Sequence, residues 1–289
     1  MATTIQSQTF GFEFEFFGIT RSEAVQAIAT HLGGRVEYTG NHYYTTDPQG
    51  RKWKVVRDGS IKATTGDPCE LVTPILRYND IETLQDIIRK LRAKGAKVNQ
   101  SCGIHIHVGA DQHDAKSLKN LMNIFYSKQE MIYRSLEVLN YRETNYARKF
   151  SEGKIENLKK EKPKTLTELG EFWYGGSIAA NQVKYNSTRY HGLNLHNVWY
   201  GQTVEFRLFN STTHAGKAKA YIQFCLAMSA LAINSRSASN KPTISDNEKY
   251  TFRTWLLRLG LIGEEFKTCR HHLLLNLEGN SAWRTPQAQ

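Results

Sequence analysis

The chain has few cysteines and none of the spacings that usually organise them. Its 289 residues include four cysteines, and no two of them form a C-x-x-C pair. A disulfide-dense secreted scaffold is therefore not expected, and a reducing cytosol is the simplest environment. Cys102 stands beside a histidine pair and could act as a nucleophile, but a small buried thiol is the commoner role. The four residues are Cys69, Cys102, Cys225 and Cys269.

The sequence also lacks segments of the kind that direct a protein to a membrane. Residues 1–10 have neither a basic start nor an apolar run, so no secretory signal is predicted. The longest apolar stretch, Phe224 to Ile233, is too short and too interrupted to span a bilayer. We therefore expect a cytoplasmic protein with no membrane partner.

Acidic residues are outnumbered by basic ones. The chain has 38 Lys and Arg against 27 Asp and Glu, which gives a formal net charge of +11. This surplus favours an anionic partner such as a nucleotide, a nucleic acid or an acidic polymer, and charge alone does not choose among them. A non-catalytic protein that binds nucleic acid is one interpretation. It is not favoured, because the basic residues are scattered along the sequence instead of following one stripe.

Apolar periodicity divides the chain into strands and helices. Alternation with a period of two predicts strands, and helical spacing predicts helices, two of which begin at Thr20 and Asp80. The expected strands are 11–17, 43–44, 53–56, 70–75, 104–108, 190–198 and 203–209. The other expected helices are 114–141, 217–233, 250–259 and 264–275. Without internal repeats or a long linker, residues 1–289 are expected to form one domain.

Two regions are expected to lie outside the sheet. The stretch from Lys149 to Lys164 mixes charges at low hydrophobicity. We expect a helical insertion or lid around residues 140–175, which either closes over a site or is an ordinary solvated helix or loop. A C-terminal helical region is expected over residues 215–289.

Four predicted strand segments carry polar residues on one face and apolar residues on the other. Alternate side chains of a strand share a face, so each segment can be sorted by position. In segment 11–17 the phenylalanines point one way and the glutamates the other, and segments 104–108, 193–196 and 203–209 divide in the same manner. The polar set is Glu13, Glu15, His105, His107, Asn194, His196, Glu205 and Arg207.

The residue types on this face favour a binding site over a solvated surface. A solvent-facing sheet usually carries Lys, Thr and Ser, whereas these positions hold carboxylates, imidazoles and a guanidinium among aromatic residues. Burying such charges costs free energy unless they pair or bind ions. Carboxylate oxygens with one imidazole suit Mg²⁺ or Mn²⁺ better than structural zinc, and hard cations in turn indicate phosphate. A zinc hydrolase built on His105 and His107 would need a third His or Cys ligand, and the sequence offers none at a characteristic spacing.

Six segments together resemble the amidoligase family, which belongs with glutamine synthetases and glutamate–cysteine ligases in the carboxylate–amine ligase group. The resemblance extends over most of the chain, although Lys149 to Lys164 and the C-terminal helices carry no motif of the family. The segments are F-G-F-E-F-E at 10–15, D-G-S at 58–60, E-L-V-T-P-I-L at 70–76, C-G-I-H-I-H-V at 102–108, R-Y-H-G-L-N-L at 189–195 and T-V-E-F-R-L-F at 203–209.

The resemblance implies an α+β fold and a set of ligands. The fold would be a curved antiparallel sheet of the glutamine synthetase catalytic-domain type, with flanking helices and a helical insertion, holding ATP and Mg²⁺ or Mn²⁺ on its concave face. It implies that His107, Arg189 and Arg207 bind the nucleotide and that both arginines take part in catalysis. The implied metal ligands are Glu13, Glu15, Glu70, His105 and Glu205. Asp58 and Ser60 match a family motif without an assigned role, and an Asp-Gly turn would account for them as well.

The implied reaction is ATP-dependent formation of an amide from a carboxylate and an amine, through an acyl phosphate. Neither substrate is identified, nor is the group that accepts the proton of the amine. Free amino acids, polyamines, peptides, cell-wall fragments and modified nucleotides remain candidates, and a peptide or an anionic polymer would suit the basic charge. The nearest alternative is a phosphotransferase of the guanidino-kinase type, which shares the sheet and the need for metal and ATP but forms no amide.

Overall fold

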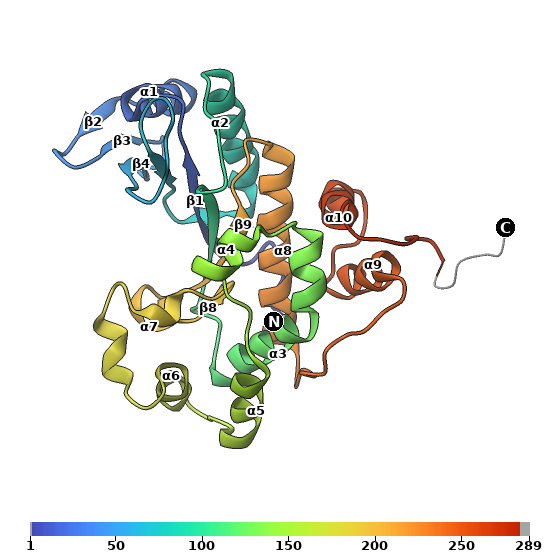
Figure 1. Ribbon diagram of the computed structural model, residues 1–289. Coiled ribbons are helices and arrows are strands. Elements are labelled where there is room, and N and C mark those ends of the chain that lie inside the picture. The colour runs from blue at the N-terminus through green and yellow to red at the C-terminus, as the bar shows by residue number, and fades with distance from the viewer. Residues whose placement is uncertain (1, 284–289) are drawn as a thin grey trace.

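An antiparallel sheet organises the protein, and two of the strands predicted to carry the polar face lie at its middle (Figure 1). The computed structural model describes residues 2–283. Within that range the strands run in the order β2-β3-β4-β5-β1-β7-β9-β8, with β6 also paired to β1, and the pairings are antiparallel. The strands are β1 (Thr9–Phe16), β2 (Val36–Tyr38), β3 (Tyr43–Thr46), β4 (Lys52–Arg57), β5 (Cys69–Val72), β6 (Leu76–Arg77), β7 (Gly103–Gly109), β8 (Leu193–Asn194) and β9 (Thr203–Asn210).

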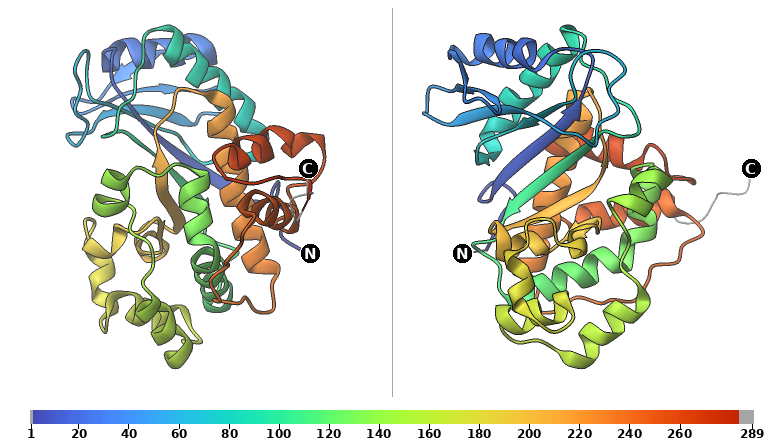
Figure 2. Two further views of the ribbon diagram at one scale, coloured as in Figure 1. Left: turned by 45° about the vertical axis from the view of Figure 1, so that its right-hand side comes forward. Right: turned by 60° about the vertical axis from the view of Figure 1, so that its left-hand side comes forward.

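Helices cover one face of this sheet (Figure 2). They are α1 (Arg21–Leu32), α2 (Ile81–Ala93), α3 (Ala115–Ser135), α8 (Ala215–Asn234), α9 (Glu248–Arg258) and α10 (Lys267–Leu274). Helix α1 packs over β3 and β4, α8 packs over β7, and α2 contacts both α1 and α8. Helices α3 and α10 pack against α8, and α9 packs against α10. Among residues 2–283, no helix combines the length and the apolar character that crossing a bilayer requires.

The apolar faces of β1 and β7 form the centre of the core, as their alternation predicts. Phe12 pairs with Ile106 and Phe14 with Ile104, and each of these side chains is at most 1% exposed. Because alternate residues of a strand point to opposite faces, burial of this apolar row turns Glu13 to the other side of the sheet. The same register sets Glu13 directly opposite His105.

The alternation of β9 is interrupted by a bulge. Ile106 pairs with Phe206 but Ile104 pairs with Phe209, so two residues of β9, Arg207 and Leu208, lie opposite the single residue between the two isoleucines. Val204, Phe206 and Leu208 are all buried in the main core, as the alternation predicts, and beyond the bulge Phe209 is buried there as well. Bulges of this kind bend a strand and re-aim its side chains.

The predicted strand at 190–198 is wrong for most of its length. Strand β8 contains only Leu193 and Asn194, and the short helix α7 begins at His196. The reason is local: the Asn194 side-chain oxygen accepts the backbone N–H of His196 at 2.8 Å, which turns the chain out of the sheet. His196 is therefore not part of the polar row, and its Nδ1 instead contacts the hydroxyl of Tyr174 at 2.7 Å.

The two predicted helix starts have different outcomes. Thr20 and Glu23 form the capping box that their spacing predicts for α1. Asp80 precedes α2, but its carboxylate makes no cap bond to that helix. It pairs with Arg51 at 2.8 Å and accepts a backbone N–H at the start of the 3₁₀ helix Tyr78–Asp80, so it caps this shorter element.

The region around 140–175 is helical, as expected of an insertion. It contains α4 (Asn140–Asn145), α5 (Glu152–Glu161) and α6 (Leu166–Tyr174), and the predicted helix 114–141 ends earlier, at Ser135. The C-terminal region expected over 215–289 is helical through α8, α9 and α10, and its residues 284–289 lie outside the described residues, as does Met1. The single-domain assignment for 1–289 stays a prediction.

Replacing Phe14 with alanine should lower the free energy of unfolding by about 3–5 kcal/mol, because its ring is fully buried and stacks on Phe16 at 4.9 Å. Ile244 is 94% exposed, so Ile244→Ala should change stability by less than about 0.5 kcal/mol. Urea denaturation followed by circular dichroism measures both variants. Equal losses would contradict the assignment of the phenylalanine face to the core.

Candidate active site

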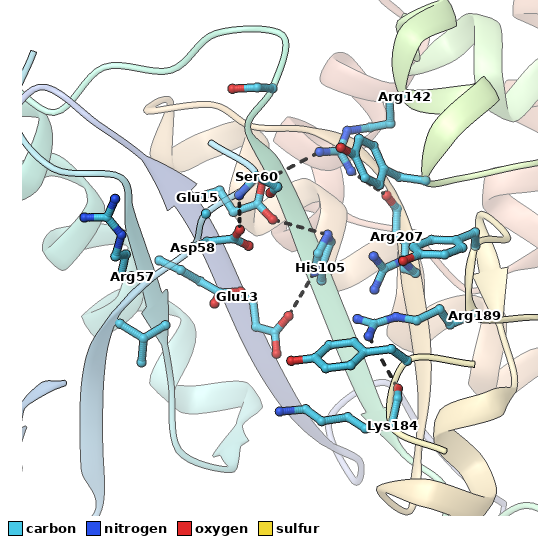
Figure 3. A pocket seen from close by; sticks show the side chains of 17 residues that line it. Glu13, Glu15, Arg57, Asp58, Ser60, His105, Arg142, Lys184, Arg189 and Arg207 are labelled. Atoms are coloured by element: carbon cyan, nitrogen blue, oxygen red, sulfur yellow. Dashed lines mark hydrogen bonds and ion pairs between the residues drawn. The ribbon is translucent and has the colours of Figure 1, made fainter. Parts of the chain in front are cut away.

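The polar face of the sheet lines a cavity of about 590 Å³ (Figure 3). The eight residues proposed from sequence as site residues come together here from five parts of the chain. His107 lines a second cavity, and Glu205 is hydrogen-bonded to Arg207. The other six line the main cavity directly: Glu13, Glu15, Glu70, His105, Arg189 and Arg207.

Glu13 lies at the centre of the polar row. Its Oε2 is 2.9 Å from His105 Nδ1, and its Oε1 is 3.4 Å from His107 Nε2. His105 extends the row in two further directions, with Nε2 at 3.7 Å from Glu15 Oε1 and Nδ1 at 3.8 Å from Glu205 Oε1. Carboxylates and imidazoles thus alternate across the middle strands of the sheet.

Three overlapping groups of ligand atoms could hold cations. Within each group the atoms all lie within 4.8 Å of one another. The groups are Glu13, His107 and Glu205; Glu13, Glu70 and His105; and Glu15, Asp58 and Glu70. Oxygen-rich sets with one imidazole suit Mg²⁺ or Mn²⁺. The third group places Asp58 among the candidate ligands, whereas the sequence matched it to a family motif without an assigned role.

The arrangement of His105 is that of a typical metal-binding histidine. An ionised carboxylate has no hydrogen to donate and can only accept a hydrogen bond. The contact between His105 Nδ1 and Glu13 Oε2 therefore requires a proton on Nδ1. Its Nε2 then carries the free lone pair, on the side of Glu15. Metal-bound histidines commonly donate their other ring N–H to a carboxylate in this way. The residues therefore fit the cations that the motifs imply.

A basic wall faces the carboxylates across the cavity (Figure 3). It is formed by Arg142 of α4, Lys184, Arg189 of the 3₁₀ helix Ser187–Arg189, and Arg207 of β9. Arg142 and Arg207 are 2% and 4% exposed, and the Nε–H of each is buried without a hydrogen-bond partner. Unpaired buried donors carry a desolvation cost that a bound anion would relieve.

Tyrosines support this basic wall. The guanidinium carbon of Arg207 lies 5.9 Å from the ring centre of Tyr190, and that of Arg189 lies 5.4 Å from Tyr185. Tyr146 also lines the cavity. Arg142, Lys184 and these tyrosines were not proposed from sequence. Tyr190 lies within the 189–195 motif, so the motif could have suggested it, whereas no periodic or motif signal distinguishes Arg142, Tyr146, Lys184 or Tyr185.

The segment that borders the cavity is not the mixed-charge stretch suggested as a lid. Of the described residues 149–164, none lines the cavity, and Ile155 and Leu158 of α5 are buried within the main core. The cavity is bordered instead by the segment 184–190. Arg148 ties this segment down by donating to the carbonyl oxygens of Tyr190 and Ser187, each at 3.1 Å.

A second cavity, of about 520 Å³, is lined by His107, whose Nε2 lies 3.4 Å from Oε1 of Glu13, a residue of the first cavity. Its floor includes Gly11, which pairs with His107 in the sheet register and leaves that position without a side chain. Apolar groups form much of its border: Pro74, Ile75, Leu166 and Val198. The two cavities therefore differ in chemistry, one bordered by charges and the other suited to a less polar group.

Comparison of the sequence with known protein families identifies one family. The model of the family described as "Putative amidoligase enzyme" matches residues 6–229, most of the chain. The chain belongs to this amidoligase family. All six motif segments lie inside the match, so the resemblance seen in the sequence is confirmed. The match also contains both cavity walls, while α9 and α10 lie outside it.

Other comparisons are more distant. No curated protein matches this chain. Among solved structures, the chain is similar to a bifunctional glutathione synthetase from Pasteurella multocida, with 12% sequence identity and a TM-score of 0.43. The alignment covers 93% of this chain and 47% of the other, so this chain spans about half the length of that structure.

Charge in the candidate site is unevenly distributed. Burial raises the pKa of Glu205, but Arg207, hydrogen-bonded to it at 2.5 Å, and the two histidines outweigh burial and bring that pKa to about 2. Glu13 behaves alike: burial opposes ionisation, and the histidines hold its pKa well below the ordinary range. Glu70 is the opposite case. Burial, then the charges of Glu13 and Glu15, raise its pKa to about 9.

Binding of Mn²⁺ near pH 7 should release a proton, because Glu70 is protonated there without metal and a cation favours its ionised form. Because the pKa of Glu70 is raised in the metal-free fold, its protonated carboxyl contributes to stability in full at pH values below its ordinary pKa of 4.5. This contribution to stability is lost as the pH rises toward about 9. Affinity for Mn²⁺ should therefore rise over the same range. Calorimetry in two buffers of different ionisation enthalpy measures the proton count.

Two variants test the origin of that proton. Glu70→Gln should bind Mn²⁺ more weakly and release no proton from this position. Glu82→Gln, an exposed carboxyl on α2, should behave as the wild type does. Wild-type binding without proton release would contradict the protonated state of Glu70.

Proposed function

We propose that the protein is an ATP-dependent carboxylate–amine ligase, which forms an amide through an acyl phosphate. The observation that carries this proposal is the pair of opposed walls of one cavity, carboxylates on one side and arginines on the other. Cations and anionic groups must meet in such a site, as they do when a phosphoryl group is transferred to a carboxylate. We further propose that the sheet is of the glutamine synthetase catalytic-domain type.

The acidic wall would hold Mg²⁺ or Mn²⁺. Glu13, Glu15, Glu70, His105 and Glu205 are the proposed ligands, joined by Asp58. Divalent ions bound here would bridge phosphate oxygens and offset charge during transfer. The chain's own part is to keep these ligands ionised and oriented. The pairing of Glu205 with Arg207 and Asn194 does this for one of them, through hydrogen bonds of 2.5 and 2.7 Å.

The nucleotide would lie across the junction of the two cavities. Its base would occupy the apolar cavity beside His107, whose floor is open at Gly11. Its phosphates would then pass Glu13 and reach the basic wall. Arg189 and Arg207 would bind the phosphates there, and Arg207, with its free buried Nε–H, would stabilise charge on the transferred group.

The reaction would proceed in two displacements. An oxygen of the substrate carboxylate attacks the γ-phosphorus and ADP leaves, giving the acyl phosphate. The amine nitrogen then attacks the acyl carbon, phosphate leaves, and the amine proton passes to a carboxylate or to water. The segment 184–190 would limit the entry of water to the acyl phosphate, taking the role first considered for 149–164.

The substrates would be a carboxylate and an amine small enough to enter beside the nucleotide, or the end of a peptide or anionic polymer that reaches the cavity from outside. We place this activity in the cytoplasm. A guanidino-kinase-type phosphotransferase would use the same metals and nucleotide, and nucleic-acid binding would use the same positive charge. The test is therefore designed around the product.

Incubation of the protein with Mg²⁺, ATP and pooled acids and amines should yield ADP together with a product whose mass equals acid plus amine minus water. Mass spectrometry detects both. Omitting the amines or adding a metal chelator should abolish the condensation product. ADP accompanied by a phosphorylated amine or guanidine would instead identify a phosphotransferase, and an absence of ADP would contradict both activities.

Glu13→Gln should reduce metal-dependent ATP turnover by at least about a hundredfold, because it removes a carboxylate shared by two of the candidate ligand groups. The amide keeps the side-chain shape, so circular dichroism should stay unchanged. Glu205→Gln should be equally inactive but also less stable, since it leaves the buried Arg207 without its partner. Wild-type turnover in both variants would contradict the proposed ligand set.

A further inference from the structure

Arg142 is a buried arginine that belongs to the insertion and reaches the sheet (Figure 3). It lies in α4 and is 2% exposed. Its Nη2 is 3.8 Å from Glu15 Oε2, and its Nη1 donates to the backbone carbonyl oxygen of Arg207 at 3.0 Å. One guanidinium therefore contacts a carboxylate of the acidic wall and the bulge that carries the central arginine of the basic wall.

The start of β7 is shaped around this guanidinium. The Gly103 N–H donates to Glu15 Oε2 at 2.5 Å, so that oxygen receives a backbone donor and also faces Arg142. A β-carbon added at Gly103 would overlap the guanidinium of Arg142. Glycine is needed here for close approach of a side chain to the backbone, since Gly103 has no positive φ.

The engagement of Glu15 Oε2 determines what its other oxygen can do. With Oε2 held by Gly103 and Arg142, Oε1 is directed to His105 Nε2, at 3.7 Å. That nitrogen is the free ligand atom of His105, so the two groups converge on the candidate cation positions. Loss of Arg142 would free the carboxylate to rotate and would remove the guanidinium that faces it at 3.8 Å.

We infer that Arg142 is a positioning residue, which fixes Glu15 and the Arg207 bulge relative to each other and so makes the insertion a structural part of the site. The inference rests on the proposed function in that Glu15 is taken as a ligand of the catalytic metal. Arg142 acts through Glu15 and the backbone of residue 207, which its Nη2 and Nη1 contact. Partners of ligand residues typically change metal affinity by about 10- to 100-fold.

The test uses the full chain and Mn²⁺ alone as the probe. Arg142→Ala should weaken Mn²⁺ binding by about 10- to 100-fold in calorimetry. Guanidinium chloride at low, non-denaturing concentration should restore part of that affinity by filling the vacated position, whereas urea, similar in shape but neutral, should not. Arg134→Ala is the matched control. It removes an ion-paired but half-exposed arginine of α3, remote from the cavity, and should bind Mn²⁺ as the wild type does.

A second variant covers failure of the first to fold. Gly103→Ala should displace the guanidinium and weaken Mn²⁺ binding in the same direction. Added to Arg142→Ala it should cost much less than it does alone, because the overlapping group is gone. Any of three results would overturn the inference. They are additive losses of Mn²⁺ affinity in the double variant, unchanged Mn²⁺ affinity in Arg142→Ala, and equal rescue of that variant by urea.

The readouts separate this inference from the proposed function. Mn²⁺ affinity and a crystal structure of Arg142→Ala need no reaction, so they report the position of Glu15 even if no amide is ever formed. A rotated Glu15 carboxylate is the expected result, and an unmoved one would overturn the inference. Amide formation by the wild type together with an unmoved carboxylate would leave the proposed function intact.

Discussion

Glu15 and Glu70 lie directly opposite each other across β1 and β5, with Asp58 beside them. Like charges at paired positions of a sheet repel, and burial weakens the screening that water would provide. Burial, then the charges of Glu13 and Glu15, raise the pKa of Glu70. The rest of the site is arranged around the same constraint. His105 approaches Glu15 from one side, Arg142 from another, and the carboxylate oxygens are close enough together for a cation to join them.

The sheet places these carboxylates together, and the surrounding elements place basic groups opposite them. Burial of the phenylalanine row of β1 against the helices leaves Glu13 and Glu15 no other face to occupy. The bulge in β9 places Arg207 and Leu208 opposite a single residue of β7, which aims the guanidinium beside Glu205 without breaking the strand. Opposed walls of charge then result because β1, β5 and β7 supply most of the acidic wall, whereas the basic wall is drawn from α4, the segment 184–190 and the bulge of β9. This division explains why a cavity so polar can exist on a well-packed sheet.

Prediction from sequence succeeded where periodicity reflects burial. The alternation of β1 and β7 could be predicted because each strand has one apolar face against the core, and α8 because its apolar run is buried from Ala220 to Ala230. Prediction failed where a local side-chain bond overrides the pattern. Asn194 captures a backbone N–H and ends β8 after two residues, and Asp80 pairs with Arg51 instead of capping α2. Alternation and capping preferences cannot show such choices, since the same residues satisfy either outcome.

By itself the sequence determined the polar face: period-two alternation with bulky apolar residues allows only one side of each strand to be buried, so Glu13, His105 and Glu205 had to share the other. Only the tertiary structure decided what faces them. Arg142, Lys184 and the tyrosines come from segments without periodicity, and their approach to the sheet depends on how the insertion packs. The lid shows the same limit. Charge composition pointed to 149–164, but burial of Ile155 and Leu158 packs that helix against the core, and the segment 184–190 borders the cavity instead.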